Sequence, residues 1–384
     1  MPPTSEPQYN LYAAQLDLRW GYEPNQEREL SMTSRDSDVL RTSESGMSLG
    51  PQQHILQLAM GYQISQALYV AVRLAIPDRL FNGPRSTEDL ANATQTHEMA
   101  LYRILRALAS VGVFRECEPR RFALTSAGKT LCSDGQSVRD LVLWTLDPFH
   151  YRIYSELLTS AKTGSSACES IFGTSVFEYF DEHRETAATF DAAMANLCEI
   201  TAPALLEAYD FSTINTLVDV AGGQGTLLME ILRQYPALQG ILCDSSRCLQ
   251  TAVVGIGRLG LEGRCVAEAV DLFERVPNGG DAYLLKNVLH DWPDDRCVRI
   301  LQNCHRAMTT MTTKQKRVLI VEAILMHGNQ TSMAKWLDVD MLVLAEGRER
   351  SVPEFSGLLE SSGFQLARVI PTRSAFSIIE AFAI

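Results

Sequence analysis

The sequence lacks an excess of positive charge. Of its 384 residues, 34 are lysine or arginine and 46 are aspartate or glutamate, so the formal net charge at pH 7 is −12. Nucleic acids and anionic membranes attract basic surfaces, and this acidic balance argues against both as general partners. No apolar run approaches the length of a membrane span, so we expect neither a nucleic-acid nor a membrane partner.

None of the nine cysteines belongs to a CxxC pair, and no histidine or cysteine lies at the spacing of metal ligands. The number of cysteines is odd, their spacing does not repeat, and we expect no signal peptide. These features are typical of reduced thiols in a cytoplasmic protein. The sequence also has no cluster of aspartate, asparagine and glutamate that would bind a cation, so we expect no metal.

The length suggests two or three domains, and a hydrophobic content of 46% with 21% charged residues is ordinary for a globular protein. Residues 1–50 are rich in polar residues and proline, which predicts a mobile arm with one short helix near residues 12–18, or an arm that lies across a partner subunit. We expect one domain over residues 51–139 and a second over residues 140–384.

The first domain reads as a winged helix. Residues 55–74 predict a helix whose apolar surface is broad enough for a subunit interface. Short helical patterns over residues 90–93 and 99–111 precede a predicted hairpin over residues 113–124. Residues 85–129 contain seven lysines and arginines and five aspartates and glutamates. The basic residues do not form a stripe that could bind DNA. A protein-contact module is therefore favoured over a DNA-binding one.

Residues 141–209 show a helical pattern that a predicted loop over residues 163–174 interrupts. Aromatic residues gather at residues 144–151 and 172–180, and Phe190 and Met194 lie four positions apart on one helix face. Core packing and a flat hydrophobic substrate pocket explain these aromatic groups equally well.

The second domain alternates strands with helices. Residues 217–220 predict a buried strand, three glycines follow, and an apolar helical pattern begins near Leu227. Further strands are predicted over residues 240–244, 265–270, 282–289 and 317–323, with a closing pair over residues 364–370 and 376–382. This rhythm predicts a doubly wound, mainly parallel α/β sheet whose ligands bind beyond the carboxyl ends of the strands.

Asp244, Asp271 and Leu272 lie at the carboxyl ends of two predicted strands, those over residues 240–244 and 265–270. Asp244 lies nineteen positions after Gly225, close to the offset of about 20 at which a carboxylate binds a ribose hydroxyl. Asp271 and Leu272 follow the next strand and could hold an adenine ring. A solvated turn aspartate is the alternative for Asp244, and the glycine turn could be structural alone.

His290 ends the predicted strand that begins at residue 282. A histidine there titrates near neutral pH and can act as a general base, a role worth about 10²–10⁴-fold in rate. Glu322, at the end of the next strand, and Glu349, in a loop before the last helix, could orient its ring. Together they predict a base with acidic supports beside a nucleotide-like pocket.

These motifs carry a resemblance to a known family. They look like the S-adenosylmethionine-dependent O-methyltransferases of the plant caffeic acid and fungal secondary-metabolite type. The matching segments are residues 217–225 (LVDVAGGQG), Asp244, Asp271, residues 286–292 (KNVLHDW), 321–322 (VE) and 347–350 (GRER) with Glu354 and Phe355, and, for the family's dimerisation winged helix, residues 101–114. The resemblance covers residues 51–384 and implies a homodimer formed through the N-terminal domain.

The resemblance implies a role for each site residue. S-adenosylmethionine would be bound by Asp219, Gly222, Gly223, Gly225, Asp244, Asp271, Leu272 and Lys286. The acceptor pocket, which in such families includes part of the partner subunit, would be lined by Phe190, Met194, Trp336, Asp340 and Met341. His290, held by Glu322 and Glu349, would take the proton of a small-molecule hydroxyl as its oxygen attacks the methyl group, without a metal.

Two departures from the family pattern affect the cofactor site. Ala221 stands where a glycine is usual, and Ser245 and Ser246 follow Asp244 where the family has leucine and proline. Two other functions stay open. Some fungal proteins of this fold act as pericyclases that dehydrate and cyclise polyketide–amino acid products, and a winged-helix regulator that senses a nucleotide would not be an enzyme.

Overall fold

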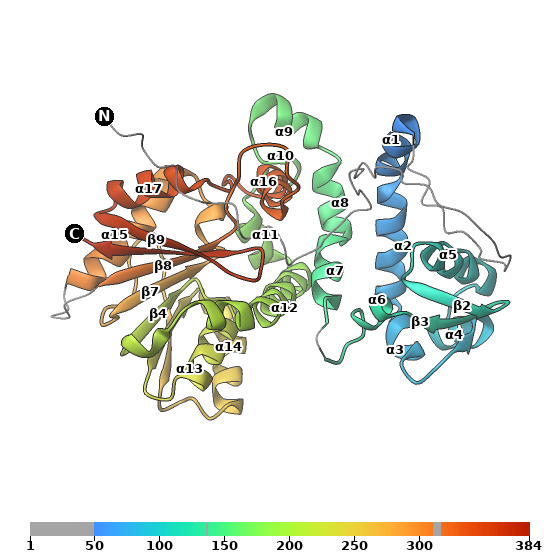
Figure 1. Cartoon of the computed structure of the whole chain (residues 1–384), viewed down its shortest axis with the longest axis horizontal. Helices are drawn as coiled ribbons and strands as arrows, with labels where there is room; N and C mark the ends of the chain where they lie inside the picture. Colours follow the sequence, from blue (N-terminus) through green and yellow to red (C-terminus); the bar gives the residue numbers. More distant parts are fainter. Residues whose placement is uncertain (1–49, 136, 310–315) are drawn as a thin grey trace, which may run out of the picture. The chain divides into compact units, whose positions relative to one another are not determined.

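The computed structural model describes residues 50–135, 137–309 and 316–384 (Figure 1). The predicted N-terminal arm, with its short helix near residues 12–18, lies outside the described residues apart from Gly50. The chain divides into two compact units, Met1–Ser65 and Gln66–Ile384.

Two helices replace the single helix predicted over residues 55–74. Helix α1 covers Pro51–Ala59 and α2 covers Gly61–Arg73, with Met60 in a turn between them. Glycine at the first position of α2 is a poor helix former, which accounts for a break at this point. The exposed apolar side chains of the two helices include Ile55, Leu56, Leu58, Tyr62 and Ile64.

One segment of the described chain, the 23 residues Pro51–Arg73 over α1 and α2, is long and apolar enough to cross a membrane by length and composition alone. Polar residues interrupt its apolar side chains, and many of these side chains are exposed in the single chain. An exposed apolar patch of this kind also marks a protein interface.

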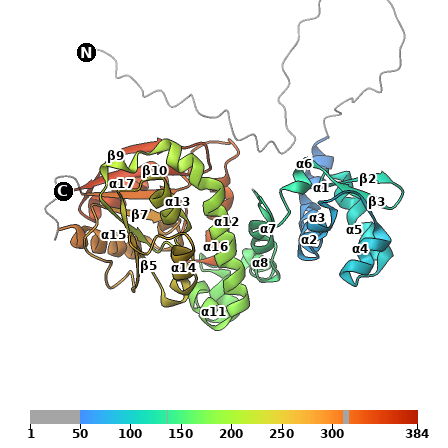
Figure 2. The same cartoon turned by 90° about the horizontal axis from the view of Figure 1, so that it is seen from below.

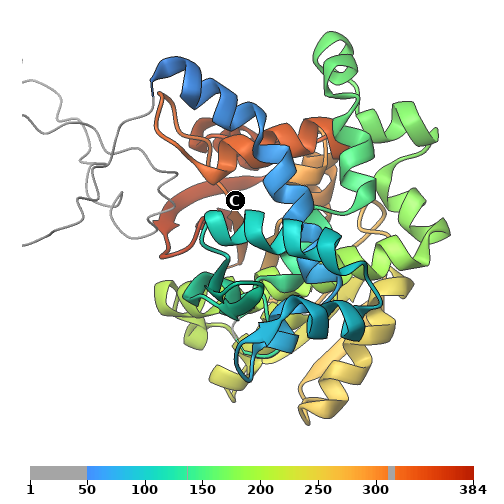
Figure 3. The same cartoon turned by 90° about the vertical axis from the view of Figure 1, so that its right-hand side faces the viewer.

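The helices and hairpin predicted for the winged helix are present. Figure 1 labels the hairpin strands β2 and β3, and Figure 3 shows the helices of this domain in blue and teal. Their bounds are α3 Ile76–Leu80, β1 Arg85–Ser86, α4 Thr87–Thr94, α5 Glu98–Ser110, β2 Phe114–Glu118, β3 Arg121–Leu124 and α6 Ser126–Lys129. The three strands form an antiparallel sheet in the order β1-β3-β2. Leu90, Leu105 and Phe122 are fully buried in the core of this domain.

Six helices lead to the large sheet, and Figure 2 shows the long α12 in green. They are α7 Arg139–Thr145, α8 Pro148–Tyr154, α9 Leu157–Thr163, α10 Ala167–Phe172, α11 Val176–Glu182 and α12 Arg184–Ala208. The predicted loop over residues 163–174 is wrong in part, because it contains α10. The Ser166 hydroxyl accepts a hydrogen bond from the Cys168 amide, which caps α10, and Ala167 and Cys168 are buried.

The large sheet has seven strands in the order β6-β5-β4-β7-β8-β10-β9. The first five are parallel, and β10 pairs antiparallel with β8 and β9, which confirms the predicted doubly wound α/β sheet with its closing pair. The strands are β4 Thr216–Val220, β5 Gln239–Asp244, β6 Cys265–Ala269, β7 Ala282–Lys286, β8 Arg317–Glu322, β9 Phe364–Pro371 and β10 Ser377–Ala383.

Helices cover both faces of this sheet (Figure 1). Leu217 of β4 packs in the core formed with α12, α13 Thr226–Gln234 and α14 Ser246–Arg258, whereas its neighbour Val218 packs with α15 Asp294–Thr309 and α17 Val352–Ser361. Successive side chains of a strand point to opposite faces, so both faces of a central strand are apolar. Helix α16, Met333–Leu344, follows β8. The carboxyl ends of β4 to β8 therefore meet at one edge.

The strand predicted over residues 282–289 is shorter than expected. Strand β7 ends at Lys286, Asn287 adopts a left-handed backbone conformation with φ 54°, and a 3-10 turn, η2, covers Leu289–Asp291. Asparagine tolerates this conformation better than most residues, which explains the reversal. His290 thus lies in a turn beyond the strand and not at its last residue.

Candidate active site

The glycine turn joins β4 to α13 at the carboxyl edge of the sheet. Ala221, Gly223 and Gly225 have φ values of 54°, 59° and 75°, so three of five consecutive residues are left-handed. At Gly222 an added Cβ would overlap the Asp219 carboxylate, whereas at Gly223 it would meet nothing within 4 Å. The turn therefore packs against the sheet on one side and leaves its backbone open on the other, as a cofactor cradle requires.

Asp244 ends β5 beside this turn. Its Oδ2 accepts a hydrogen bond from the Gly223 amide at 2.8 Å, and its Oδ1 accepts one from the Ser245 amide at 2.6 Å. The carboxylate is thereby held at the edge where a ribose would lie. The Ser245 hydroxyl makes no cap to α14, whose N-terminus it precedes.

Asp271 and Leu272 lie in the loop just after β6, the strand that pairs with β5. The Asp271 carboxylate accepts a hydrogen bond from the Phe273 amide at 2.8 Å, and the Leu272 carbonyl accepts one from Asn303 Nδ2 at 2.8 Å. These bonds fix the loop that follows β6 at the same edge as Asp244. The assignment of both residues to an adenine ring stays a prediction.

Asp219 and Lys286 place opposite charges beneath the turn, on adjacent strands. Burial raises the pKa of Asp219 to about 7; the negative charge of Asp244 adds to the rise and the positive charge of Lys286 opposes it. Lys286 Nζ donates to Asn287 Oδ1 at 3.0 Å and lies 5.1 Å from the centre of the Phe376 ring. The edge thus carries two carboxyl groups and one ammonium group close to the open backbone.

His290 lies among three carboxyl groups. Its Nδ1 is 2.8 Å from Glu349 Oε1 and 3.6 Å from Glu322 Oε2, and its Nε2 is 3.6 Å from Asp291 Oδ1. Glu322 and Glu349 have exposed fractions of 0% and 1%. Glu322 Oε1 accepts hydrogen bonds from the Val288 and Leu289 amides at 3.0 and 2.9 Å, which ties it to the turn that carries His290.

These contacts shift the pKa values of His290 and of its neighbouring carboxyl groups. Burial alone would lower the pKa of His290, but the charges of Glu322, Asp291 and Glu349 raise it to about 10. Burial raises the pKa of Glu322 to about 7 and that of Asp291 to about 6, against the attraction of His290. Because Nδ1 donates to Glu349, the nitrogen that can exchange a proton with a ligand is Nε2.

The fold brings together three possible metal ligands that are distant in the sequence. One nitrogen or oxygen each from His290, Glu322 and Glu349 lie within 4.8 Å of one another. His290 Nδ1 and Glu349 Oε1 are bonded to each other, and Glu322 Oε1 already accepts two amide hydrogen bonds. One oxygen of each glutamate, Glu322 Oε2 and Glu349 Oε2, has no hydrogen-bond partner among the described residues. The hydrogen bond between His290 and Glu349 makes the cluster an acid–base group by its present geometry.

Aromatic side chains pack beside α12. Phe190 lies 5.1 Å from Trp144 and 4.9 Å from Phe180, measured between ring centres. Met194 packs against the same cluster, in which Met341 of α16 is 5% exposed. The aromatic groups at residues 144–151 and 172–180 therefore form one core, and Phe190, Met194 and Met341, which were predicted to line the acceptor pocket, pack with it. Trp336 stands apart, with an exposed fraction of 70% in the single chain.

Asp340 joins this aromatic cluster to the charged group. His150 Nδ1 donates to the Trp144 carbonyl at 2.9 Å, and its Nε2 is 3.5 Å from Asp340 Oδ1. Burial raises the pKa of Tyr154, and so do the charge of Asp340 and the hydrogen bond to it. Asp340 also contributes to the raised pKa of Asp291, so its charge acts on the site of His290.

Sequence reasoning missed several residues of this site. Asp291 belongs to the motif over residues 286–292, but its place in the site was not predicted; its carboxylate lies 3.6 Å from His290 Nε2. Tyr154 and the pairing of His150 with Asp340 were not anticipated, because these residues are almost 190 positions apart and no local pattern connects them. Arg350 belonged to a quoted motif, but its role was not predicted.

The chain matches two known domain families. Residues 154–365 match the O-methyltransferase domain, and residues 56–134 match the O-methyltransferase dimerisation domain. The chain belongs to the O-methyltransferase family.

Relatives and solved structures agree with this assignment. Phenazine O-methyltransferase PhzM of Lysobacter antibioticus is 40% identical over 328 residues, which cover 85% of this chain and 95% of the relative. The crystal structure of LaPhzM superposes with a TM-score of 0.83 at 39% identity and covers 88% of this chain and 100% of that one. NcsB1 from neocarzinostatin biosynthesis, solved with S-adenosylmethionine and 2-hydroxy-5-methyl naphthoic acid, has a TM-score of 0.71 at 30% identity and covers 83% and 96% of the two chains.

Ala221 and Gly223 form a matched pair for testing backbone strain in the turn. A left-handed conformation costs a residue with a Cβ about 1–2 kcal/mol. We expect Ala221→Gly to raise the free energy of unfolding, by about 1 kcal/mol after the greater chain entropy of glycine is subtracted. Gly223→Ala, where space for a methyl group is open, should lower it by a similar amount. Denaturant titration of both variants measures the free energy of unfolding. An Ala221→Gly variant that is less stable than wild type would contradict the prediction that Ala221 is strained.

Proposed function

We propose that the protein transfers a methyl group from S-adenosylmethionine to a hydroxyl of a small aromatic or polyketide-type secondary metabolite, with His290 as general base. The observation that carries this proposal is the buried bond between His290 Nδ1 and Glu349, which leaves Nε2 as the nitrogen available to an acceptor hydroxyl. Membership of the O-methyltransferase family supports the reaction, and the NcsB1 complex supports the cofactor.

The described residues suit S-adenosylmethionine. The open backbone beside Gly223 would admit the cofactor, and the Asp244 carboxylate, which accepts a hydrogen bond from the Gly223 amide, would bind the ribose hydroxyls. Gly222 and Gly225 shape the turn. Asp219 and Lys286 would supply charges for the amino acid end of the cofactor, and Asp271 and Leu272 would hold its adenine ring. When bound, S-adenosylmethionine supplies a methyl group activated by its positively charged sulfur.

The catalytic contribution of the chain is to accept and hold a proton. His290 Nε2 takes the proton of the acceptor hydroxyl as the oxygen becomes nucleophilic. Glu349 fixes the ring through Nδ1, and the charges of Glu322 and Asp291 stabilise the imidazolium that forms. Helix α12 with Phe190 and Met194, together with Met341 and Asp340 of α16, would orient the acceptor, and such positioning accounts for much of the rate in enzymes that bring two reactants together.

The acceptor class rests on the aromatic cluster and on the names of the relatives. Phe190 and Met194 are only partly buried at the edge of the aromatic core, so they can contact a flat apolar molecule, and Asp340 offers one polar contact. Phenazine and naphthoic acid, named for PhzM and NcsB1, are flat aromatic compounds. Trp336, exposed in the single chain, is free to contact an acceptor or a partner subunit.

We further propose a cytoplasmic homodimer formed through the N-terminal domain. The dimerisation-domain match begins at residue 56, within the exposed apolar segment of α1 and α2. Burial of these side chains against a second copy would remove apolar surface from water. All nine cysteines are free thiols, as expected in a reducing compartment.

A label-transfer experiment tests the reaction. The protein is incubated with methyl-labelled S-adenosylmethionine and hydroxylated phenazine, naphthoate and benzoate acceptors. We expect labelled ether products, and a rate about 10²–10⁴-fold lower in His290→Ala because the general base is lost. His305→Ala is the control, because His305 lies on α15 and contacts the Ile384 carbonyl and is not one of the site residues.

The outcomes separate the alternatives raised by the sequence. An acceptor that changes without gaining label would replace methyl transfer with a pericyclase-type reaction. Label transfer that survives unchanged in His290→Ala would remove His290 from the role of base.

The pH dependence of the reaction gives a second prediction. His290 must be neutral to act as a base, and its pKa is raised to about 10, so kcat/KM for the acceptor should rise with pH. Glu349→Gln removes one of the negative charges that raise this pKa. We therefore expect the rising limb to move to lower pH, by about 1–3 units for the loss of a close opposite charge. A limb at the same pH in both proteins would show that another group titrates.

The proposed dimer predicts the effect of charges on α1. We expect Ile55→Glu combined with Leu58→Glu to give monomers at micromolar concentration in analytical ultracentrifugation, because both side chains are more than half exposed in the single chain. Val266→Glu on β6 is the control, as Val266 is equally exposed but lies outside the dimerisation match. A double variant that sediments like wild type would place the interface elsewhere.

A further inference from the structure

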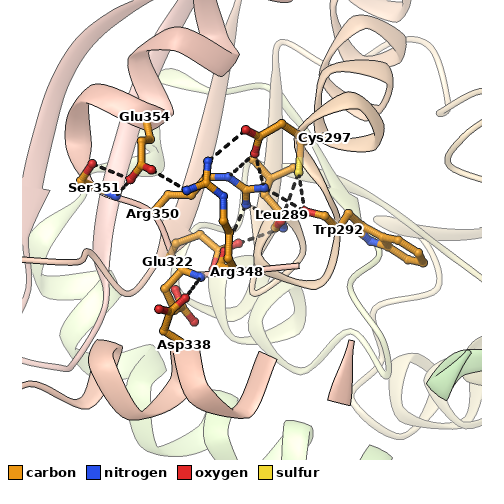
Figure 4. Close-up of polar contacts among 11 residues, drawn as sticks. Leu289, Trp292, Cys297, Glu322, Asp338, Arg348, Arg350, Ser351 and Glu354 are labelled. Carbon is orange, nitrogen blue, oxygen red and sulfur yellow. Dashed lines mark hydrogen bonds and ion pairs between the residues drawn. The ribbon is translucent and has the colours of Figure 1, made fainter. Parts of the chain in front are cut away.

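Arg350 is a buried cation with an unusually complete set of partners. Its exposed fraction is 0%, although a buried guanidinium is costly unless it is paired and hydrogen-bonded. Nη1 donates to the Leu289 carbonyl at 2.8 Å, and Nη2 donates to the Trp292 carbonyl at 2.8 Å (Figure 4). Nε and Nη2 also donate to Asp294 Oδ1 at 3.0 and 2.7 Å.

The two carbonyl groups flank the reacting part of the site. Leu289 and Trp292 are the residues immediately before His290 and immediately after Asp291. Arg350 therefore holds both ends of the turn whose two central residues carry the imidazole and the nearest carboxylate. The Cys297 thiol donates weakly to the same two carbonyls at 3.1 and 3.3 Å, which shows how densely this backbone is held.

The residue before Arg350 holds the same turn from its other side. Glu349 bonds to His290 Nδ1, and its own amide donates to Asp338 Oδ1 of α16 at 2.9 Å. Residue 350 forms an isolated parallel bridge with Ile324, so the segment is extended here. Adjacent side chains of an extended segment point in opposite directions. Glu349 therefore bonds to the imidazole of His290, and Arg350 bonds to the backbone carbonyls of Leu289 and Trp292.

Gly347 shows how closely the two segments approach. A Cβ at this position would overlap the His290 carbonyl oxygen and the backbone of Asp291 and Trp292. The loop over residues 345–351 therefore lies directly on the turn that carries His290. This contact leaves no room for a side chain, and the bonds of Arg350 fix the position of one segment on the other.

We infer that Arg350 is a positioning residue, which acts through the Leu289 and Trp292 carbonyls to keep His290 in its bond with Glu349. It bonds to neither the glycine turn nor the aromatic cluster, and its action is confined to the geometry of the base. This inference rests on the proposed role of His290 as the base. Asp294, which accepts two of the bonds of Arg350, completes the arrangement from the first turn of α15.

Arg348 provides a matched control from the same loop. It also bonds to Asp294, through Oδ2 at 3.0 Å, and it pairs with Glu354. Its side chain is 45% exposed, and no bond joins it to a carbonyl of the turn. Arg348→Met thus removes a cation and a bond to Asp294 but leaves the bonds of Arg350 to the turn in place.

The test compares Arg350→Met, Arg350→Lys and Arg348→Met in the full chain. With saturating cofactor and the acceptor found by label transfer, we expect kcat to fall about 10²-fold in Arg350→Met, the loss that a misplacement of about 1 Å can cause. The dissociation constant of S-adenosylmethionine, measured by calorimetry, should stay at the wild-type value. Arg350→Lys should be intermediate, because an ammonium group cannot bond to both carbonyls in the geometry of the guanidinium fork. Arg348→Met should match wild type in both.

A readout that needs no acceptor separates this inference from the proposed function. The titration of His290 is followed by NMR of protein with ¹⁵N-labelled histidine, and its signal is assigned by comparison with His290→Ala. A weaker bond to Glu349 should lower the pKa of His290 in the Arg350 variants but not in Arg348→Met. If that shift occurs while wild type transfers no methyl group, the proposed function fails and the positioning role stands.

Two results would overturn the inference. One is an Arg350→Lys variant with wild-type kcat and a wild-type His290 titration. The other is a parallel loss of cofactor binding and thermal stability that accounts for all of the lost activity, which would make Arg350 a structural residue only. If Arg350→Met does not fold, Asp294→Asn serves in its place, because it weakens two bonds of Arg350 without removing the guanidinium.

Discussion

The hydrogen bond between His290 and Glu349 is the interaction on which the arrangement of the site depends. It joins the turn after β7 to the loop before α17, two segments separated by 59 residues, in a region where both side chains are buried. A buried carboxylate needs a partner, and a buried imidazole beside it gains a proton. The same bond therefore gives one oxygen of Glu349 a partner, selects the ring nitrogen that stays available, and holds two parts of the sheet edge together.

The buried carboxyl groups around His290 lower the stability of the fold and are typical of a catalytic site. Glu322 and Asp291 are kept near His290 although burial raises the pKa of both carboxyl groups. One oxygen of Glu322 and one of Glu349 are buried without a hydrogen-bond partner. An apolar packing of the same volume would avoid this cost. Strained or unsatisfied groups of this kind gather at functional sites, where activity offsets the loss of stability.

Much of the fold could be predicted because it follows local periodicity. The alternation of apolar strands with amphipathic helices gave the parallel sheet, and the sheet alone places Asp244, Asp271 and Glu322 at one edge. Errors arose where one residue overrides the pattern. The left-handed Asn287 ends β7 early, Gly61 divides the predicted helix, and the Ser166 cap creates α10 within a predicted loop. The direction of a side chain such as Arg350, or the pairing of His150 with Asp340, depends on tertiary packing that periodicity does not encode.

The short extended segment at Glu349 and Arg350 has a consequence for insertions and deletions. Opposite charges alternate along it, with the anion directed to the imidazole and the cation to the carbonyl groups. A shift of one residue along the chain exchanges the two directions, as in any strand. It would present a guanidinium to His290 and a carboxylate to two carbonyl oxygens, so both contacts would become repulsive at once. The number of residues between Gly347 and Arg350 is therefore constrained as tightly as the identities of Gly347, Glu349 and Arg350 themselves.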